Sequence, residues 1–158
     1  MEWHIICEPD EISRYVFCPG DQGGTYRAGG TANAYLPLAF PAVPTFAVLR
    51  QLVASAETLN IPHTVGIGIA GDAFYAPRDP HFGAMLKEAG VVSVEMESDT
   101  LFILGAYRGW RTGALYASDG APGVIKPEWG EADYRQGEQN IIKIALEAMW
   151  HIVQADGG

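Results

Sequence analysis

Residues 94–102 read VEMESDTLF and lie where an apolar run gives way to a predicted helix. They place the carboxylates of Glu95 and Glu97 directly after a predicted strand. Two further polar or aromatic clusters also follow apolar runs: GDAFY at residues 71–75 and SDG at residues 118–120. In α/β sheets, ligands bind at the carboxyl ends of strands. The three clusters therefore predict one site built from strand ends.

The composition predicts one globular domain spanning residues 1–158, because 48% of the chain is hydrophobic and 18% is charged. A net charge of −9, with 10 basic residues and no basic run, excludes a surface for nucleic acid or an anionic membrane. No apolar run reaches the ~20 residues of a membrane span, and no charged leader precedes one. Cys7 and Cys18 are too few for a disulfide framework, so we expect a reducing cytoplasm.

The hydrophobic periodicity predicts an α/β fold with three layers, α/β/α, around a central mixed, largely parallel sheet. The expected helices are residues 45–60, 81–89, 98–108 and 132–154, and the expected strands are residues 4–7, 15–18, 63–70, 91–94 and 110–117. We expect Thr45 and Ser98 to cap their helices and Gly90 to end the second. From Thr45 onward strands and helices alternate, which predicts parallel strands with helices on both faces.

The two glutamates have two interpretations. A carboxylate accepts hydrogen bonds from two neighbouring hydroxyls, such as those of a ribose, and Met96 offers an apolar surface for a sugar. Alternatively, Glu95 and Glu97 are an ordinary acidic helix start that the helix dipole favours. If the helix begins at Ser98, one carboxylate reaches into the cleft while the other supports the backbone.

Other candidates also keep two interpretations. Asp119 suits a general acid if it is partly buried, or it is a turn aspartate before glycine. Phe74 stacks on a planar ring or packs in the core. His4 is a surface residue or a donor to a site. The glycines between residues 19 and 30 form an anion-binding loop or a plain turn.

These residues together resemble the nucleoside phosphorylase family of the purine/uridine type. The most specific match is VEMES at residues 94–98, a Glu-Met-Glu sequence at a strand end followed by an apolar helix. Further matching segments occur in the family's order and cover nearly the whole chain; they are residues 1–5, 15–21, 30–37, 40–43, 71–75, 112–119 and 142–147.

The resemblance implies cleavage of the N-glycosidic bond of a nucleoside by inorganic phosphate, giving ribose 1-phosphate and free base without a cofactor or metal. It implies nucleoside and phosphate as partners and a homo-oligomer built from dimers. The implied residues are Glu97, Met96 and Glu95 at the ribose; Phe74 and Val94 at the base; Asp119, beside Ser118 and with Arg135 as its partner, as the catalytic acid; His4 from a neighbouring subunit; and Gly20 at the phosphate.

Two features bear on the substrate. Ser118-Asp119 and the short loop after Tyr75 favour a purine nucleoside, as in purine salvage, whereas the helix start at residues 97–102 favours uridine. We expect purine over uridine.

The chain also departs from the family. Where the family carries a phosphate-binding arginine, Gln22-Gly23-Gly24 stands here, and a central block with further phosphate-binding arginines is missing. The pattern predicts an internal deletion between Gly23 and Tyr26. Two alternatives to phosphorolysis therefore stay open: a nucleosidase that uses water, and a non-catalytic remnant that binds nucleosides or only packs against partners.

Overall fold

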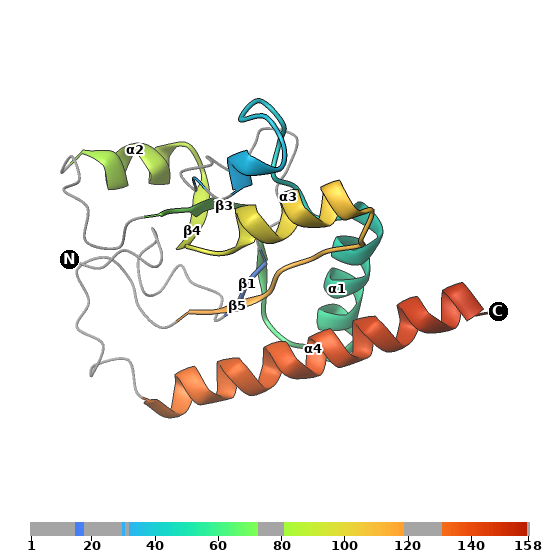
Figure 1. Cartoon of the computed structure of the whole chain (residues 1–158). Coiled ribbons are helices and arrows are strands. Elements are labelled where there is room, and N and C mark those ends of the chain that lie inside the picture. The colour runs from blue at the N-terminus through green and yellow to red at the C-terminus, as the bar shows by residue number, and fades with distance from the viewer. Residues whose placement is uncertain (1–14, 18–29, 31, 73–80, 119–130, 158) are drawn as a thin grey trace.

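The computed structural model describes residues 15–17, 30, 32–72, 81–118 and 131–157 (Figure 1). Expected features elsewhere, including the strand at residues 4–7 and the glycine-rich loop, lie outside these residues. The elements in chain order are β1 (Tyr15–Phe17), the 3-10 helix η1 (Ala32–Ala34), α1 (Phe46–Thr58), β2 (Thr64–Val65), β3 (Ile67–Ala70), α2 (Phe82–Glu88), β4 (Val91–Glu95), α3 (Ser98–Arg108), β5 (Tyr116–Ala117) and α4 (Glu131–Gly157).

The described strands form a mixed, largely parallel arrangement. β3 and β4 pair in parallel, and a three-stranded sheet has the order β2-β1-β5, with β1 parallel to β2 and antiparallel to β5. Gly66 separates β2 from β3. A Cβ at this position would lie 2.6 Å from the Val92 side chain, so the interruption is a place where only glycine lets the neighbouring strand come close.

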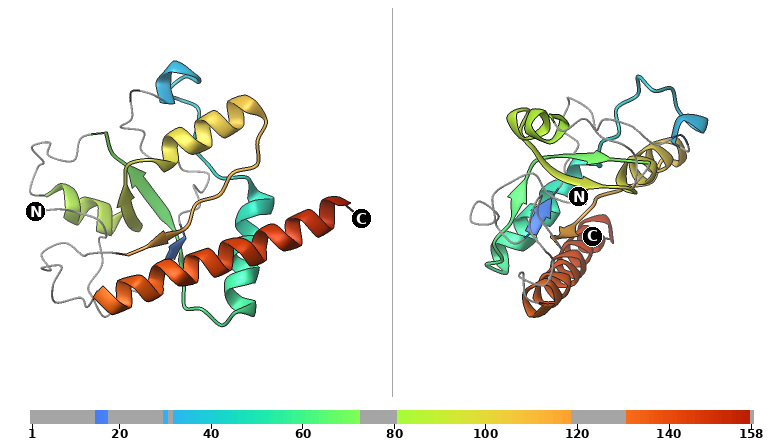
Figure 2. Two further views of the ribbon diagram at one scale, coloured as in Figure 1. Left: turned by 60° about the horizontal axis from the view of Figure 1, so that its bottom comes forward. Right: turned by 90° about the vertical axis from the view of Figure 1, so that its left-hand side faces the viewer.

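Helices cover the strands on both sides, as the alternating pattern predicts (Figures 1 and 2). α2 and α3 lie on one side, and the long α4 lies on the other, crossing α1. Three small hydrophobic clusters hold these layers together. They are Leu52, Ala56, Ile144 and Ala148 between α1 and α4; Ile69, Leu86 and Val91 between α2 and the β3–β4 pair; and Ala32, Ala42, Phe102 and Ile103 between the η1 segment and α3.

All four predicted helices are confirmed, and their ends follow backbone chemistry. Gly90, after α2, and Gly109, after α3, have φ values of +76° and +71°. Left-handed backbone of this kind suits glycine and stops a helix. Among the described helices, none is both long and apolar enough to cross a lipid bilayer.

The predicted strand at residues 110–117 is wrong for most of its length, because only Tyr116 and Ala117 pair with another strand. The preceding residues are held by helices instead. Thr45 N–H donates to the Thr112 carbonyl at 2.8 Å, and Thr112 N–H donates to the Thr45 Oγ1 at 3.1 Å. Thr45 therefore stands at the N-cap of α1, but its side chain does not cap the helix. The prediction that the Thr45 side chain caps α1 is therefore also wrong.

The same segment is tied to the end of α4. The Arg111 guanidinium donates to the Asp156 carboxylate, with Nη1 and Oδ1 3.1 Å apart. This hydrogen bond lowers the pKa of the Asp156 carboxyl. Residues 110–115 thus run as a connecting segment between α1, α3 and α4.

The close packing of residues 110–115 against α3 can be tested at Gly105. A Cβ at Gly105 would overlap the methyl group of Thr112, whose backbone Thr45 holds in place. We expect Gly105→Ala to lower the free energy of unfolding by about 1–3 kcal/mol, although alanine is the better helix former. Adding Thr112→Ser removes the methyl group and should restore most of the loss. Urea denaturation of the single and double variants measures this, and a stabilised Gly105→Ala variant would contradict it.

Candidate functional site

The described parts of two predicted clusters, residues 71–72 and 94–98, meet at one edge of the β3–β4 pair. Ala70 and Glu95 are register partners at the carboxyl ends of the two strands, and Gly71 N–H donates to the Glu95 carbonyl at 2.8 Å. The Asp72 carboxylate accepts a hydrogen bond from Gly30 N–H at 2.8 Å. The turn after β3, the end of β4 and the start of the η1 segment are therefore joined here, as the parallel order predicts.

The carboxylate of Glu95 holds the start of α3. Its Oε2 accepts from the N–H groups of Glu97 and Ser98 at 2.8 and 2.7 Å, and its Oε1 accepts from the Ser98 hydroxyl at 2.6 Å. The first N–H groups of a helix have no partner within the helix, so the strand-end carboxylate supplies one. Ser98 was expected to cap α3. That prediction is wrong, because Ser98 is the first helical residue and its hydroxyl donates to Glu95.

The carboxylate of Glu97 faces solvent. Glu97 occupies the N-cap of α3 with non-helical backbone, and its Oε2 accepts only a long bond of 3.2 Å from Met96 N–H among the hydrogen bonds described. Met96 beside it is 38% exposed. A free carboxylate and a thioether thus lie together on the surface at this edge. Of the two glutamates, Glu95 supports the backbone and Glu97 is open to a ligand.

Asp99, which the sequence did not single out, is a buried carboxyl group in the first turn of α3. It is 1% exposed. Its Oδ1 accepts from the N–H and hydroxyl of Thr100 at 2.5 and 3.2 Å, whereas its Oδ2 has no hydrogen-bond partner in the described part of the chain. An aspartate there is the ordinary pattern of a helix start. No signal in the sequence marks this one as buried.

The other predicted residues are dispersed. Val94 is half-buried and packs against the cluster beneath α2. Ser118 is half-buried and follows β5 in the three-stranded sheet, and Arg135 is exposed near the start of α4. Asp119, Phe74, His4 and Gly20 lie outside the described residues. Within the described ranges, no group of histidine, cysteine, aspartate and glutamate side chains is arranged to hold a metal ion.

Residues 9–151 match the sequence profile of the phosphorylase superfamily. A uridine phosphorylase from Treponema pallidum is 32% identical over 144 residues, which are 84% of this chain and 55% of the relative. A purine nucleoside phosphorylase from Plasmodium falciparum is 35% identical over 147 residues, which are 89% of this chain and 58% of the relative.

Solved structures give the same fold. A Plasmodium knowlesi homologue of the Plasmodium falciparum purine nucleoside phosphorylase superposes with a TM-score of 0.74 at 24% identity, over 97% of this chain and 60% of that one. An AMP nucleosidase from Bacteroides thetaiotaomicron superposes with a TM-score of 0.72 at 20% identity, over 96% and 58%. The chain therefore spans little more than half the length of the relatives it matches.

The structural role of Glu95 and the exposed position of Glu97 predict different effects on stability when each is replaced by alanine. Glu95→Ala leaves two N–H groups and a hydroxyl without their acceptor, so we expect the free energy of unfolding to fall by about 2–4 kcal/mol. Glu97→Ala removes an exposed carboxylate and should change it by less than about 0.5 kcal/mol. Urea denaturation of both variants is the measurement. Equal losses would show that Glu97 is also structural.

The unpartnered oxygen of Asp99 predicts a stabilising substitution. Asp99→Ala removes a buried polar atom without a partner, and this gain should exceed the loss of the short-range bonds to Thr100. We expect the free energy of unfolding to rise by about 1 kcal/mol. Glu57→Ala, which removes an exposed carboxylate from α1, is the control for general charge effects. A destabilised Asp99→Ala variant would mean that the oxygen has a partner.

Proposed function

This chain belongs to the nucleoside phosphorylase family, and on that premise we propose that it cleaves the N-glycosidic bond of a nucleoside with phosphate. The products are a free base and ribose 1-phosphate. Enzymes of this family need no cofactor, and phosphate is their co-substrate. The observation that carries the proposal is the exposed Glu97 carboxylate beside Met96, at the edge where β3 and β4 end together.

Glu97 would bind the sugar. Its two carboxylate oxygens can accept from two adjacent ribose hydroxyls, and such charge-assisted hydrogen bonds contribute about 1.5–3 kcal/mol each. Met96 would lie beneath the sugar ring. Glu95 has both oxygens engaged at the start of α3, so it acts as a positioning residue that sets the place of Glu97.

The leaving base would be stabilised from the other side. In an oxocarbenium-like transition state the sugar gains positive charge as the base gains negative charge. We assign Asp119, with Ser118 beside it and Arg135 as its partner, to protonate or hydrogen-bond the base, and Phe74 and Val94 to line the base pocket. His4 would reach the ribose of a neighbouring subunit, and Gly20 would contact phosphate.

A purine nucleoside is the proposed substrate. Ser118-Asp119 supplies an acid suited to a purine leaving group, and the loop after Tyr75 is short. The ESDTLF helix start favours uridine, so the two substrates need direct comparison.

Hydrolysis is the second candidate, and one observation favours it. The sequence carries Gln22-Gly23-Gly24 where a phosphate-binding arginine is expected, and the block with the other phosphate-binding arginines is missing. Without these cations a phosphate dianion is bound poorly. Water would then replace phosphate as the nucleophile, and ribose would replace ribose 1-phosphate as the product.

The test measures release of hypoxanthine from inosine and of uracil from uridine, with and without phosphate. We expect phosphate-dependent release, faster from inosine. Glu97→Gln should lower kcat/KM about 100-fold, which corresponds to about 2.7 kcal/mol of lost transition-state binding. Glu57→Gln, an exposed change of the same type on α1, should leave the rate unchanged.

The outcomes separate the candidates. Equal rates with and without phosphate would identify a nucleosidase. Release of neither base under either condition would end both enzymatic proposals, and calorimetry with inosine would then decide whether the chain still binds nucleosides. A Glu97→Gln variant with full activity would remove Glu97 from the ribose site.

A further inference from the structure

The long helix α4 carries apolar side chains around more of its circumference than its contacts within the chain use. On one side, Ile144 and Ala148 are buried against α1. A second row, here called the outer face, is between 57% and 63% exposed; it consists of Ile142, Leu146, Met149, Trp150 and Val153. A helix that packs against one neighbour needs one apolar stripe. The outer face is additional, and no described residue covers it.

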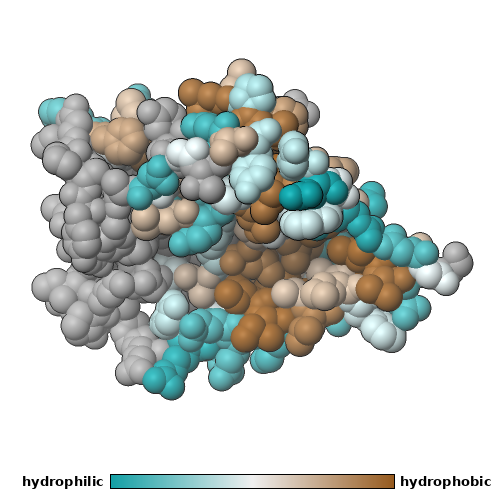
Figure 3. Space-filling model, viewed as in Figure 1, coloured by the Kyte–Doolittle hydropathy of each residue, from teal (hydrophilic) through white to brown (hydrophobic). Residues whose placement is uncertain are grey.

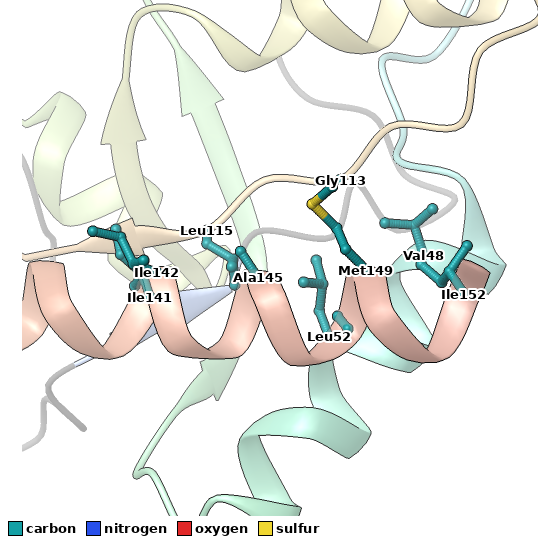
Figure 4. Close-up of a pocket in the computed structure, with 10 residues that line it drawn as sticks. Val48, Leu52, Gly113, Leu115, Ile141, Ile142, Ala145, Met149 and Ile152 are labelled. Atoms are coloured by element: carbon teal, nitrogen blue, oxygen red, sulfur yellow. The ribbon is translucent and has the colours of Figure 1, made fainter. Parts of the chain in front are cut away.

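An open groove continues the outer face toward α1 (Figure 4). Its volume is about 390 Å³, and it is lined by apolar side chains of α1 and α4 together with Gly113 and Leu115. Ile142 and Met149 belong to both the groove and the outer face, and Met149 points across the groove toward Gly113. Figure 3 shows hydrophobic residues gathered over α4 and the surface beside it. The groove and the outer face form one apolar surface.

We propose that this surface is the contact between two copies of the chain, with their α4 helices packed antiparallel about a two-fold axis. Ile142, Leu146, Met149 and Val153 are separated by 4, 3 and 4 residues. This is the spacing with which two helices interlock, and it reads the same in both directions. An axis between Leu146 and Met149 therefore places Ile142 against the partner's Val153 and Leu146 against the partner's Met149, as a self-complementary contact requires.

The exposed area supports a second copy as the occupant. Five large apolar side chains, each more than half exposed, adjoin one groove. Monomers rarely expose contiguous apolar patches larger than a few hundred Å², and a standard interface buries about 800 Å² per partner. Tryptophan side chains often contribute most of the binding energy of an interface, and Trp150 lies exposed on the same surface as the groove. One chain thus presents both halves of the contact.

Charge gives the contact a distinctive salt dependence. No residue of the outer face is charged, whereas the chain as a whole has a net charge of −9. Two copies therefore repel one another at a distance and adhere only through apolar burial. Added salt screens the repulsion without weakening that burial. We expect the dimer to tighten as sodium chloride is raised, the opposite of an association through ion pairs.

Sedimentation equilibrium of the 158-residue chain across micromolar concentrations tests the proposal. The expected mass is that of two chains. Leu146→Glu brings two like charges together near the axis and should raise the dimer dissociation constant about 30-fold or more. Gln154→Glu adds the same charge at an exposed position of α4 outside the outer face and should leave it within about twofold.

Circular dichroism confirms that each variant keeps its helices. If Leu146→Glu does not fold, Trp150→Ala removes the projecting side chain and should still weaken the dimer about tenfold. A mass of one chain throughout the concentration range would overturn the proposal, as would a dimer that both substitutions leave unchanged. This readout needs no nucleoside, so it stands or falls independently of the proposed activity.

The antiparallel orientation of the two α4 helices can be tested separately by disulfide cross-linking. In a background with Cys7 and Cys18 replaced by serine, we expect Ile142→Cys chains mixed with Val153→Cys chains to form a disulfide on mild oxidation. Antiparallel packing brings these two positions together, within the reach of a disulfide. Cross-links that form only between two Ile142→Cys chains would overturn the antiparallel arrangement.

Discussion

The hydrogen bonds accepted by the Glu95 carboxylate are the contact on which the arrangement of the candidate site depends. They satisfy two backbone N–H groups and a hydroxyl where β4 ends and α3 begins, with two residues between the elements. Bonds to a charged group contribute roughly 1.5–3 kcal/mol each, enough to hold so short a connection. The side chains of the two connecting residues, Met96 and Glu97, are left on the surface. The carboxylate of Glu95 thus fixes the position of the exposed carboxylate of Glu97.

The parallel pair β3–β4 extends this constraint to neighbouring segments. Because Ala70 and Glu95 are register partners, the turn after β3 must leave the sheet beside Glu95, and Gly71 N–H donates to the Glu95 carbonyl. Asp72 in that turn then holds Gly30 at the start of the η1 segment. Residues more than 40 positions apart in sequence are therefore joined by backbone pairing and one side chain. Proline-rich residues 37–44 form no strand, and Ala42 among them packs in the cluster with Phe102 and Ile103 of α3.

Local chemistry made the helices predictable, whereas contacts between distant residues did not show in the sequence. Periodic apolar residues and glycines gave the bounds of α1, α2, α3 and α4 closely. The expected caps failed because the two hydroxyls have other partners: Thr45 accepts from the distant Thr112 N–H, and Ser98 donates to Glu95, three residues before it. Residues 110–115 have the sequence of a strand, but Ala114 and Leu115 pack against helices instead of across a sheet. For the site, the sequence predicted that one of Glu95 and Glu97 supports the backbone while the other reaches into the cleft. Only the three-dimensional contacts assign the structural role to Glu95.

The apolar pattern of α4 shows why burial is harder to predict than secondary structure. A broad apolar stripe predicts a helix, but it does not say how many neighbours the helix has. Here the stripe is divided: Ile144 and Ala148 meet α1, while Leu146 and Met149 remain exposed. Selection for stability of an isolated chain would give exposed positions polar residues, since apolar side chains in water contribute nothing to folding and promote association. Retaining them in a regular order is expected only if the face is buried in the working protein. The 4-3-4 order, symmetric about its centre, fits the antiparallel pairing of two identical helices.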